Sequence, residues 1–172
     1  MIDKILKLAN DIDDLWKEYT YKEIEFSKIC EEKLNKFECC ETIGNLEIDL
    51  GQWLLNKTIP KQINVYNSFG QPPITIFNNK KFVIDIYFWM HADTSIHDHS
   101  FSGAFKVLHG RSIHEEFKIE KIKAYSEDVL KTKVSRFKNE SLKVGDTRAI
   151  IAGDEFTHRV IHLDRPTITL CV

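Results

Sequence analysis

The histidines of this chain are the residues whose type and spacing most directly indicate chemistry. The chain of 172 residues contains seven of them. Five lie within one short stretch, and two lie far downstream: His91, His97, His99, His109 and His114, then His158 and His162. Neutral imidazole is a good ligand for iron, zinc, copper and nickel. The distribution is therefore a reason to test the histidines as a metal-binding site.

The segment Ile96-His97-Asp98-His99 offers the first two ligands. If the chain is extended here, both imidazoles point to one face, about 7 Å apart at their Cα atoms, while Asp98 points away. Two such rings can reach one ion at ligand distances of about 2.1 Å. Two surface histidines on a strand have the same spacing, so the pair needs a third ligand to become a prediction.

A third histidine follows the turn-like segment 153–157, and we interpret it as the start of a strand. A closed antiparallel barrel can bring this residue, His158, next to His97 and His99. On an unbroken strand His162 shares the face of His158, and we interpret it, together with the adjacent Arg159, as a tentative catalytic, substrate-contacting or ligand-supporting residue. The alternative for both is an ordinary strand residue at the surface.

Three further groups are weaker candidates. His109 and His114 flank Gly110 at a turn, which favours a solvated position for both rings. His91 lies in a loop before the histidine pair and is a weaker candidate for the site. The aromatic residues of segment 87–89 favour a core position over a ligand pocket.

The elements that must position these residues differ between the two ends of the chain. Apolar residues recur at three- and four-residue steps over 2–16 and, less regularly, over 24–37, which predicts two amphipathic helices. A short third helix is expected around 50–55. After Pro60, short runs rich in β-branched and aromatic residues alternate with turn residues. The predicted strands cover 74–77, 82–89, 103–108, 112–125, 129–138, 147–151, 158–162 and 167–172.

Eight short strands with turn signals between them are typical of an antiparallel sandwich or barrel. We therefore predict a mainly β protein with two parts. Residues 1–60 form an N-terminal helical extension that packs on the barrel, and residues 61–172 form the barrel itself.

Two motifs in this second part resemble the cupin superfamily. Ser95-Ile96-His97-Asp98-His99-Ser100, with the segment 105–108 and Gly110 after it, looks like the first cupin motif, in the version found in cysteine dioxygenase and related thiol dioxygenases. Gly145, the segment 158–160 and Pro166 resemble the second motif, and the run 83–89 is similar to the strand before the first. The resemblance covers roughly residues 70 to 172.

This resemblance implies a cupin-type double-stranded β-helix, also called a jelly-roll barrel, with an N-terminal α-helical extension. It carries His97, His99 and His158 over as the three ligands of a mononuclear non-haem Fe(II). The general motif has a glutamate as a fourth ligand, but Gly103 stands at the matching position. The missing carboxylate favours iron oxygenases over manganese enzymes, while Zn, Ni or Mn remain alternative metals.

The function implied is an Fe(II)- and O2-dependent oxygenase that acts on a small molecule. A thiol suits such a centre because the charge of the metal promotes thiol deprotonation. The family's Ser-His-Tyr triad would fall at Thr169 and Cys171, with the tyrosine position beyond Val172. Two alternatives stay open: a metal-independent cupin isomerase or epimerase that uses a histidine base, and a non-catalytic ligand-binding cupin.

Composition excludes several other classes. The chain has 24 basic and 26 acidic residues and a formal net charge of -2, without a block of like charge, so no nucleic-acid partner is expected. No apolar run approaches the ~20 residues of a membrane span, and no secretory leader is recognisable, so we expect a cytoplasmic protein without a membrane partner. The four cysteines lack CxxC spacing and are interpreted as reduced thiols. The sequence indicates no oligomeric state.

Overall fold

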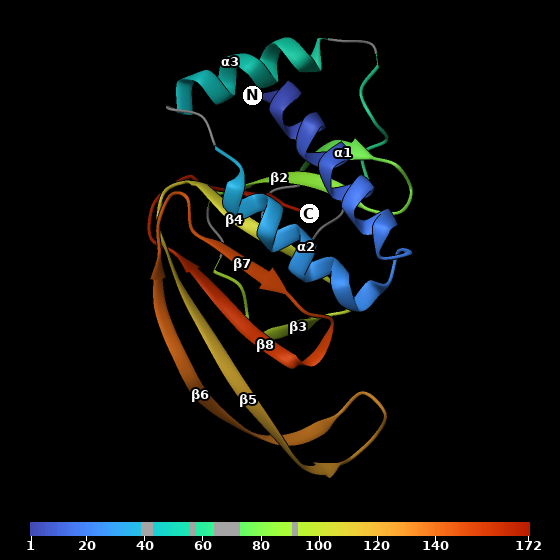
Figure 1. The fold of residues 1–172 in the computed structure, drawn as a ribbon. Coiled ribbons are helices and arrows are strands. Elements are labelled where there is room, and N and C mark those ends of the chain that lie inside the picture. The colour runs from blue at the N-terminus through green and yellow to red at the C-terminus, as the bar shows by residue number, and fades with distance from the viewer. Residues whose placement is uncertain (39–42, 56–57, 64–72, 91–92) are drawn as a thin grey trace.

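The structure is a computed structural model, and it describes residues 1–38, 43–55, 58–63, 73–90 and 93–172. Within these residues the chain forms three helices followed by nine strands (Figure 1). The helices are α1 (Ile2–Glu18), α2 (Glu23–Lys36) and α3 (Ile43–Leu54). The strands are β1 (Ile74–Asn78), β2 (Val83–Trp89), β3 (His97–His99), β4 (Gly103–His109), β5 (Ser112–Ala124), β6 (Leu130–Leu142), β7 (Thr147–Ile150), β8 (Gly153–His162) and β9 (Thr167–Cys171).

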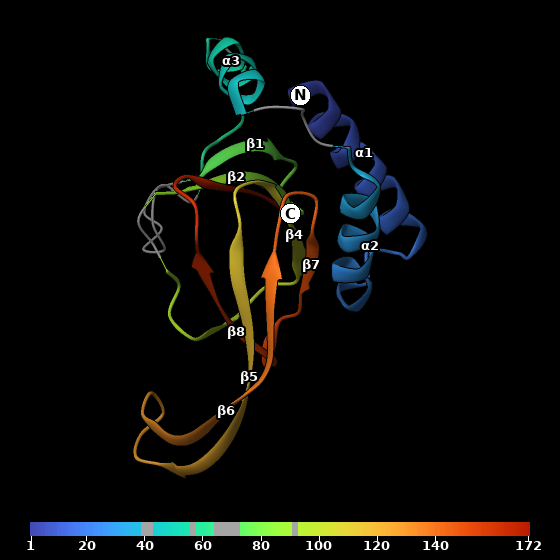
Figure 2. The ribbon, with the colours of Figure 1, turned by 90° about the vertical axis from the view of Figure 1, so that its left-hand side faces the viewer.

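The strands form two sheets, and the paired strands run antiparallel. One sheet has the order β1-β2-β9-β4-β7, and the other has the order β3-β8-β5-β6. The sheets face each other and form the two walls of a barrel (Figures 1 and 2). The protein is therefore mainly β, with the cupin-type double-stranded β-helix and the N-terminal helices that the sequence predicted.

The five-stranded sheet separates the main core from the inside of the barrel. Side chains alternate between the two faces of a strand. On β2, Ile84 and Ile86 therefore pack toward the helices, while Tyr87 and Trp89 point into the barrel. The same two-residue alternation on β9 sends Leu170 to the helical side and leaves the neighbouring Thr169 and Cys171 inside the barrel.

The main hydrophobic core lies between this sheet and the helices. Ile5 and Ile12 of α1 and Leu34 of α2 are fully buried in one cluster with the outward face of β2 and β9. Each such side chain stabilises the fold by about 1.5–3 kcal/mol. Figure 2 shows α1 and α2 beside the sheet, with α2 against β4 and β7. The predicted domain boundary after residue 60 stays a prediction.

Lys106 joins the sheet to α2. It lies on the helix-facing side of β4 and is only 4% exposed. Its Nζ donates a hydrogen bond of 2.8 Å to the carbonyl oxygen of Leu34, in the last turn of α2. The last carbonyls of a helix lack partners within the helix and carry a partial negative charge, so an ammonium group there is stabilising. The barrel and the helical extension thus share a polar contact as well as a core.

Strand boundaries differ from the sequence predictions where pairing decides them. The prediction included no strand at 97–99, but β3 forms there because these residues pair with β8. β8 begins at Gly153, five residues before the predicted start, and Gly153 has a φ of +95°, which glycine adopts without strain. β6 continues to Leu142 because β5 pairs with it as far as Ser112.

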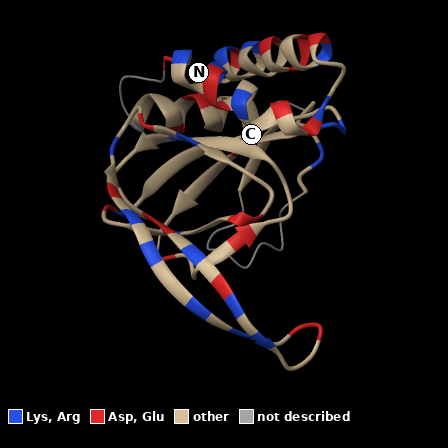
Figure 3. Ribbon diagram, turned by 60° about the horizontal axis from the view of Figure 1, so that its bottom comes forward, with Lys and Arg blue, Asp and Glu red and all other residues tan. Residues whose placement is uncertain are grey.

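The β5–β6 hairpin extends well beyond the barrel (Figures 1 and 2). Lys and Arg along it are interspersed with Asp and Glu (Figure 3). Charges of both signs are thus present on this exposed segment, and the absence of a nucleic-acid partner stays a prediction. None of the helices among the described residues has the length and apolar character required to span a bilayer. Cys30 and Cys171 are free thiols, and Cys39 and Cys40 lie outside the described residues.

Candidate metal centre

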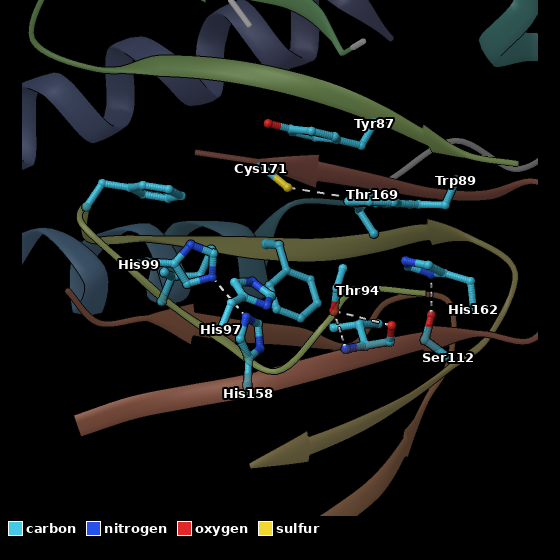
Figure 4. Close-up of a pocket in the computed structure, with 14 residues that line it drawn as sticks. Tyr87, Trp89, Thr94, His97, His99, Ser112, His158, His162, Thr169 and Cys171 are labelled. Atoms are coloured by element: carbon cyan, nitrogen blue, oxygen red, sulfur yellow. Dashed lines mark hydrogen bonds between the residues drawn. The ribbon is translucent and has the colours of Figure 1, made fainter. Parts of the chain in front are cut away.

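The structure brings together the three histidines that the sequence singled out. β3 pairs with β8 so that His97 lies directly opposite His158, and His99 follows two residues later. The ring centroids of His97 and His158 are 4.6 Å apart, those of His99 and His158 are 5.0 Å apart, and those of His97 and His99 are 4.8 Å apart. One nitrogen from each ring lies within 4.8 Å of the other two. Figure 4 shows the rings turned toward one another.

The spacing of the donor atoms suits a transition-metal ion. The Nε2 atoms of His99 and His158 are 2.8 Å apart. An ion with ligand distances of about 2.1 Å holds two nitrogens at a right angle about 3.0 Å apart. A shift of a few tenths of an ångström therefore separates the present geometry from that of two ligands on one ion. The three histidines therefore fit the predicted metal ion.

The hydrogen bond of His97 fixes which of its nitrogens faces the cluster. Its Nδ1 lies 2.7 Å from the carbonyl oxygen of Ser95. A carbonyl oxygen only accepts, so Nδ1 carries the proton and donates. The lone pair of the neutral ring is then on Nε2, as a metal ligand requires.

The tautomer of His158 is set by a longer chain of hydrogen bonds that begins at Glu140. The guanidinium of Arg148 donates to Glu140 with an Nε–Oε1 distance of 2.8 Å. Arg148 holds the pKa of Glu140 well below its usual range, so this carboxylate is ionised and only accepts. His114, whose Nδ1 lies 2.9 Å from Glu140 Oε1, must therefore donate from that nitrogen.

The same chain of donors continues from His114 to His158. With its proton on Nδ1, His114 accepts at Nε2, which lies 2.9 Å from Nδ1 of His158. His158 thus donates from Nδ1, and its lone pair on Nε2 faces His99. Carboxylates and imidazoles behind a metal ligand orient it and raise its basicity in this way.

The predicted solvated position of His114 is wrong. The ring is fully buried because β5 lies between β8 and β6 in the sheet, and this face of β5 is turned into the barrel. Glu140 was also missed, since the predicted strand ended at residue 138. The burial of His114 could have been predicted from its two-residue spacing from Ser112, which places both side chains on one face of a predicted strand.

Burial keeps the imidazoles of His99 and His158 neutral. Desolvation, followed by the influence of the neighbouring histidines, lowers the pKa of His158 to about 2. Desolvation likewise lowers the pKa of His99 to about 4. At neutral pH neither ring holds a second proton that a metal ion would have to displace.

These shifts predict that the metal-free protein loses stability as the pH falls below 6.5. In the unfolded chain a histidine binds a proton below about pH 6.5, whereas His158 in the folded protein does not until about pH 2. The unfolded state then binds more protons, so the free energy of unfolding falls by about 1.4 kcal/mol per pH unit for this residue. Thermal unfolding between pH 7.5 and 5 measures the slope. His158→Gln should flatten it, and an unchanged slope in that variant would contradict the assignment.

Arg159 is not brought to the site. It follows His158 by one residue in an extended strand, so it lies on the opposite face of β8. There its Nε donates to Glu115, which also receives Arg136. Arg159 is absent from the residues that line the cavity beside the histidines. The tentative interpretation of Arg159 as a substrate contact or ligand support is therefore corrected.

His162 does lie beside the cluster, in the same cavity. It stands four residues after His158 on the same face, stacks on Trp89 with a centroid distance of 4.6 Å, and places Nδ1 3.0 Å from Ser112 Oγ. Its catalytic role stays a prediction. The remaining candidate, His91, lies outside the described residues.

The cavity has a volume of about 160 Å³ and lies between the two sheets. Figure 4 shows the three histidines at one end and His162 at the other. Tyr87 and Trp89, which the sequence favoured as core residues, line it. Cys171 lines it too, and burial raises the pKa of this thiol to about 12, so it stays protonated at neutral pH.

Gly103, which the sequence resemblance matches to a carboxylate ligand, leaves no room for a side chain. A Cβ added there would lie 1.9 Å from the carbonyl oxygen of Val172. Val172 is held in place by Ala104, with backbone hydrogen bonds of 3.2 and 2.9 Å in the two directions. The backbone of Val172 thus closes this position to any larger residue.

We expect Gly103→Ala to lower the free energy of unfolding by about 1–3 kcal/mol, because the new methyl group displaces paired backbone. Urea denaturation measures the change. Gly51→Ala is the matched control, since Gly51 lies in α3 with no atom near its added Cβ, and alanine there should be neutral or stabilising. Equal stabilities of wild type and Gly103→Ala would show that Val172 yields readily.

No protein-family model and no curated protein matches the chain. Among solved structures, a hydroquinone 1,2-dioxygenase in complex with Cd2+ and 4-hydroxybenzonitrile matches at 18% identity with a TM-score of 0.42, over 61% of this chain and 64% of that one. A DMSP lyase structure matches at 18% identity with a TM-score of 0.37, over 54% of this chain and 38% of that one. A cupin-2 domain protein from Shewanella frigidimarina matches at 13% and 0.41, over 73% and 90%.

The chain thus spans less than two thirds of the dioxygenase and of the lyase chains. At these identities and TM-scores the matches say nothing of ligand or chemistry. The fold and the cluster define the chain as a cupin-fold protein with a three-histidine arrangement that can hold a metal ion.

Proposed function

We propose that this protein is a mononuclear non-haem Fe(II)- and O2-dependent oxygenase that acts on a small molecule. The observation that supports it most is the convergence of His97, His99 and His158 at one end of a cavity. Three neutral imidazoles leave a divalent ion its full charge and open coordination positions. Fe(II) at this site would supply the one-electron chemistry through which O2 reacts with organic molecules.

The residues of the chain have separate roles in this proposal. The three histidines hold the ion, and His114 with Glu140 keeps the lone pair of His158 directed at it. The aromatic residues of β2 and the side chain of Val160 keep bulk water from the reacting atoms. His162 meets the substrate at the far end of the cavity.

Free cysteine matches the cavity poorly, although the sequence resembles thiol dioxygenases. None of the described lining residues is Asp, Glu, Lys or Arg. The carboxylate and ammonium groups of an amino acid would thus be buried there without a partner from these residues, which is costly. A thiol therefore stays a predicted substrate only where the rest of the molecule is uncharged.

The test is anaerobic loading with Fe(II), measurement of bound iron per chain, and O2 uptake in the presence of a panel of small molecules. The proposal expects one iron per chain and O2 uptake that a chelator abolishes. Turnover that persists with a chelator and without O2 would indicate an isomerase or epimerase instead. Bound iron without O2 uptake for any compound would favour a ligand-binding cupin, and a protein that takes up no iron would refute the proposal.

A further inference from the structure

The hydroxyl groups at the far end of the cavity are already used within the protein. Thr94 Oγ1 accepts a hydrogen bond of 2.7 Å from the amide of Val160, and Thr169 Oγ1 accepts one of 3.0 Å from Trp89 Nε1. Ser112 Oγ pairs with Nδ1 of His162 at 3.0 Å. These groups anchor the walls, and they are poorly placed to specify a ligand.

The Nε2 atom of His162 is the exception. It is buried, and it has no hydrogen-bond partner among the described residues. Such an atom in a cavity wall is a place where a ligand gains by supplying the missing partner. Depending on the tautomer that Ser112 selects, Nε2 donates or accepts, and a ligand hydroxyl can satisfy either.

The walls around this nitrogen are flat and aromatic. The Trp89 ring stacks on His162 at an interplanar angle of 17°, and Tyr87 stacks beside Trp89 at 10° with centroids 5.2 Å apart. Stacked rings of this kind favour a planar ligand. The cavity volume of about 160 Å³ is close to the 150 Å³ that accommodates benzene in an engineered protein core.

The lining also selects against charge. As noted above, its described residues include no acidic or basic side chain apart from histidine. Burial lowers the pKa of His162 to about 4, so that ring is neutral as well. An anion placed beside His162 would lose its hydration without gaining a counter-charge. A cation there would meet the carboxylate of Asp93, but Asp93 Oδ1 is already used, because it accepts a hydrogen bond of 3.2 Å from the backbone amide of His162.

We propose that the cavity binds an uncharged molecule with a single aromatic ring, whose hydroxyl group pairs with Nε2 of His162. The ring lies between the stacked aromatic residues and the three histidines, and the hydroxyl lies at the end remote from them. Only the designation of this ligand as a substrate rests on the proposed function. The binding itself does not.

Three compounds of nearly the same size and different charge test the proposal: benzyl alcohol, benzoate and benzylammonium. They are titrated calorimetrically at pH 7 into metal-free protein, because a bound ion would itself attract benzoate. We expect benzyl alcohol to bind at least about 30-fold more tightly than either ion. Equal affinities for the three compounds would overturn the proposal.

The role of His162 is tested by His162→Phe, which keeps the stacked ring and removes the nitrogen. We expect it to weaken benzyl alcohol binding about 5- to 10-fold and to leave toluene binding unchanged, so toluene reports that the cavity is intact. His109→Asn, outside the cavity, should change neither. A parallel loss for both compounds in His162→Phe would show that Nε2 recognises no hydroxyl.

The two proposals fail in different ways. If the protein takes up no Fe(II) but still discriminates by charge, the oxygenase proposal fails and the ligand class stands. If one Fe(II) binds per chain and the three compounds bind equally, the metal centre stands and the ligand class is refuted.

Discussion

Replacement of His158 by alanine is expected to abolish stoichiometric Fe(II) binding. This residue is only 3% exposed, lies opposite His97 in the strand register, and has its Nε2 2.8 Å from that of His99. Loss of a residue that merely supports a metal ligand reduces affinity by about 10- to 100-fold, and removal of a ligand itself should exceed that range. His97→Ala should have a similar effect.

The measurement is competition with a chelator of known affinity, with Co(II) as an air-stable substitute for Fe(II). His109→Ala serves as the control because His109 lies at the end of β4 and does not line the cavity. Circular dichroism separates loss of metal from loss of fold. If the His158→Ala variant retains one tightly bound ion, the three histidines are not the metal site.

Glu140→Gln is expected to weaken metal binding by about 10- to 100-fold. An amide can donate as well as accept, so it no longer forces His114 to hold its proton on Nδ1. His158 then loses the acceptor that directs its own lone pair toward the cluster. The geometry of the three rings is retained, but the tautomer that binds an ion is no longer enforced.

Glu115→Gln is the matched control for this variant. Glu115 is a buried carboxylate that accepts hydrogen bonds from Arg136 and Arg159, just as Glu140 accepts them from Arg148. Glu115, however, lies on the face of β5 opposite to His114. Both variants should lose stability because each breaks a partly buried ion pair. Only Glu140→Gln should lose metal affinity. Equal losses of affinity would mean that general destabilisation, and not proton placement, is the cause.

Periodicity and turn residues were sufficient to predict most of the fold. The amphipathic pattern located α1 and α2, and β-branched runs between turns located eight of the nine strands, since these signals are local. β3 has only three residues and no apolar pattern, so its existence depends on its pairing with β8, which lies more than fifty residues away in sequence.

The site was predictable to a similar degree. The two-residue spacing of His97 and His99 and the position of His158 after a turn were enough to nominate the cluster. The buried hydrogen-bond network behind the cluster could not be predicted, because it depends on the pairing of β5 with both β8 and β6 in the sheet. It also depends on β6 continuing beyond the residues whose apolar pattern predicted it. Arg159 was assigned to the site although the alternation of side chains along a strand, which places His162 on the face of His158, places Arg159 on the opposite face.

The division of the five-stranded sheet into a helix-facing and a cavity-facing side has an evolutionary consequence. The large core holds the helices against one side, whereas the residues that meet a ligand project from the other. Substitutions on the cavity side that keep the hydrogen bond between Trp89 and Thr169 can therefore accumulate with limited damage to the core beneath the helices. Such a protein can acquire new ligand preferences through substitutions on the cavity-facing side of β2 and β9 while the core under the helices stays unchanged.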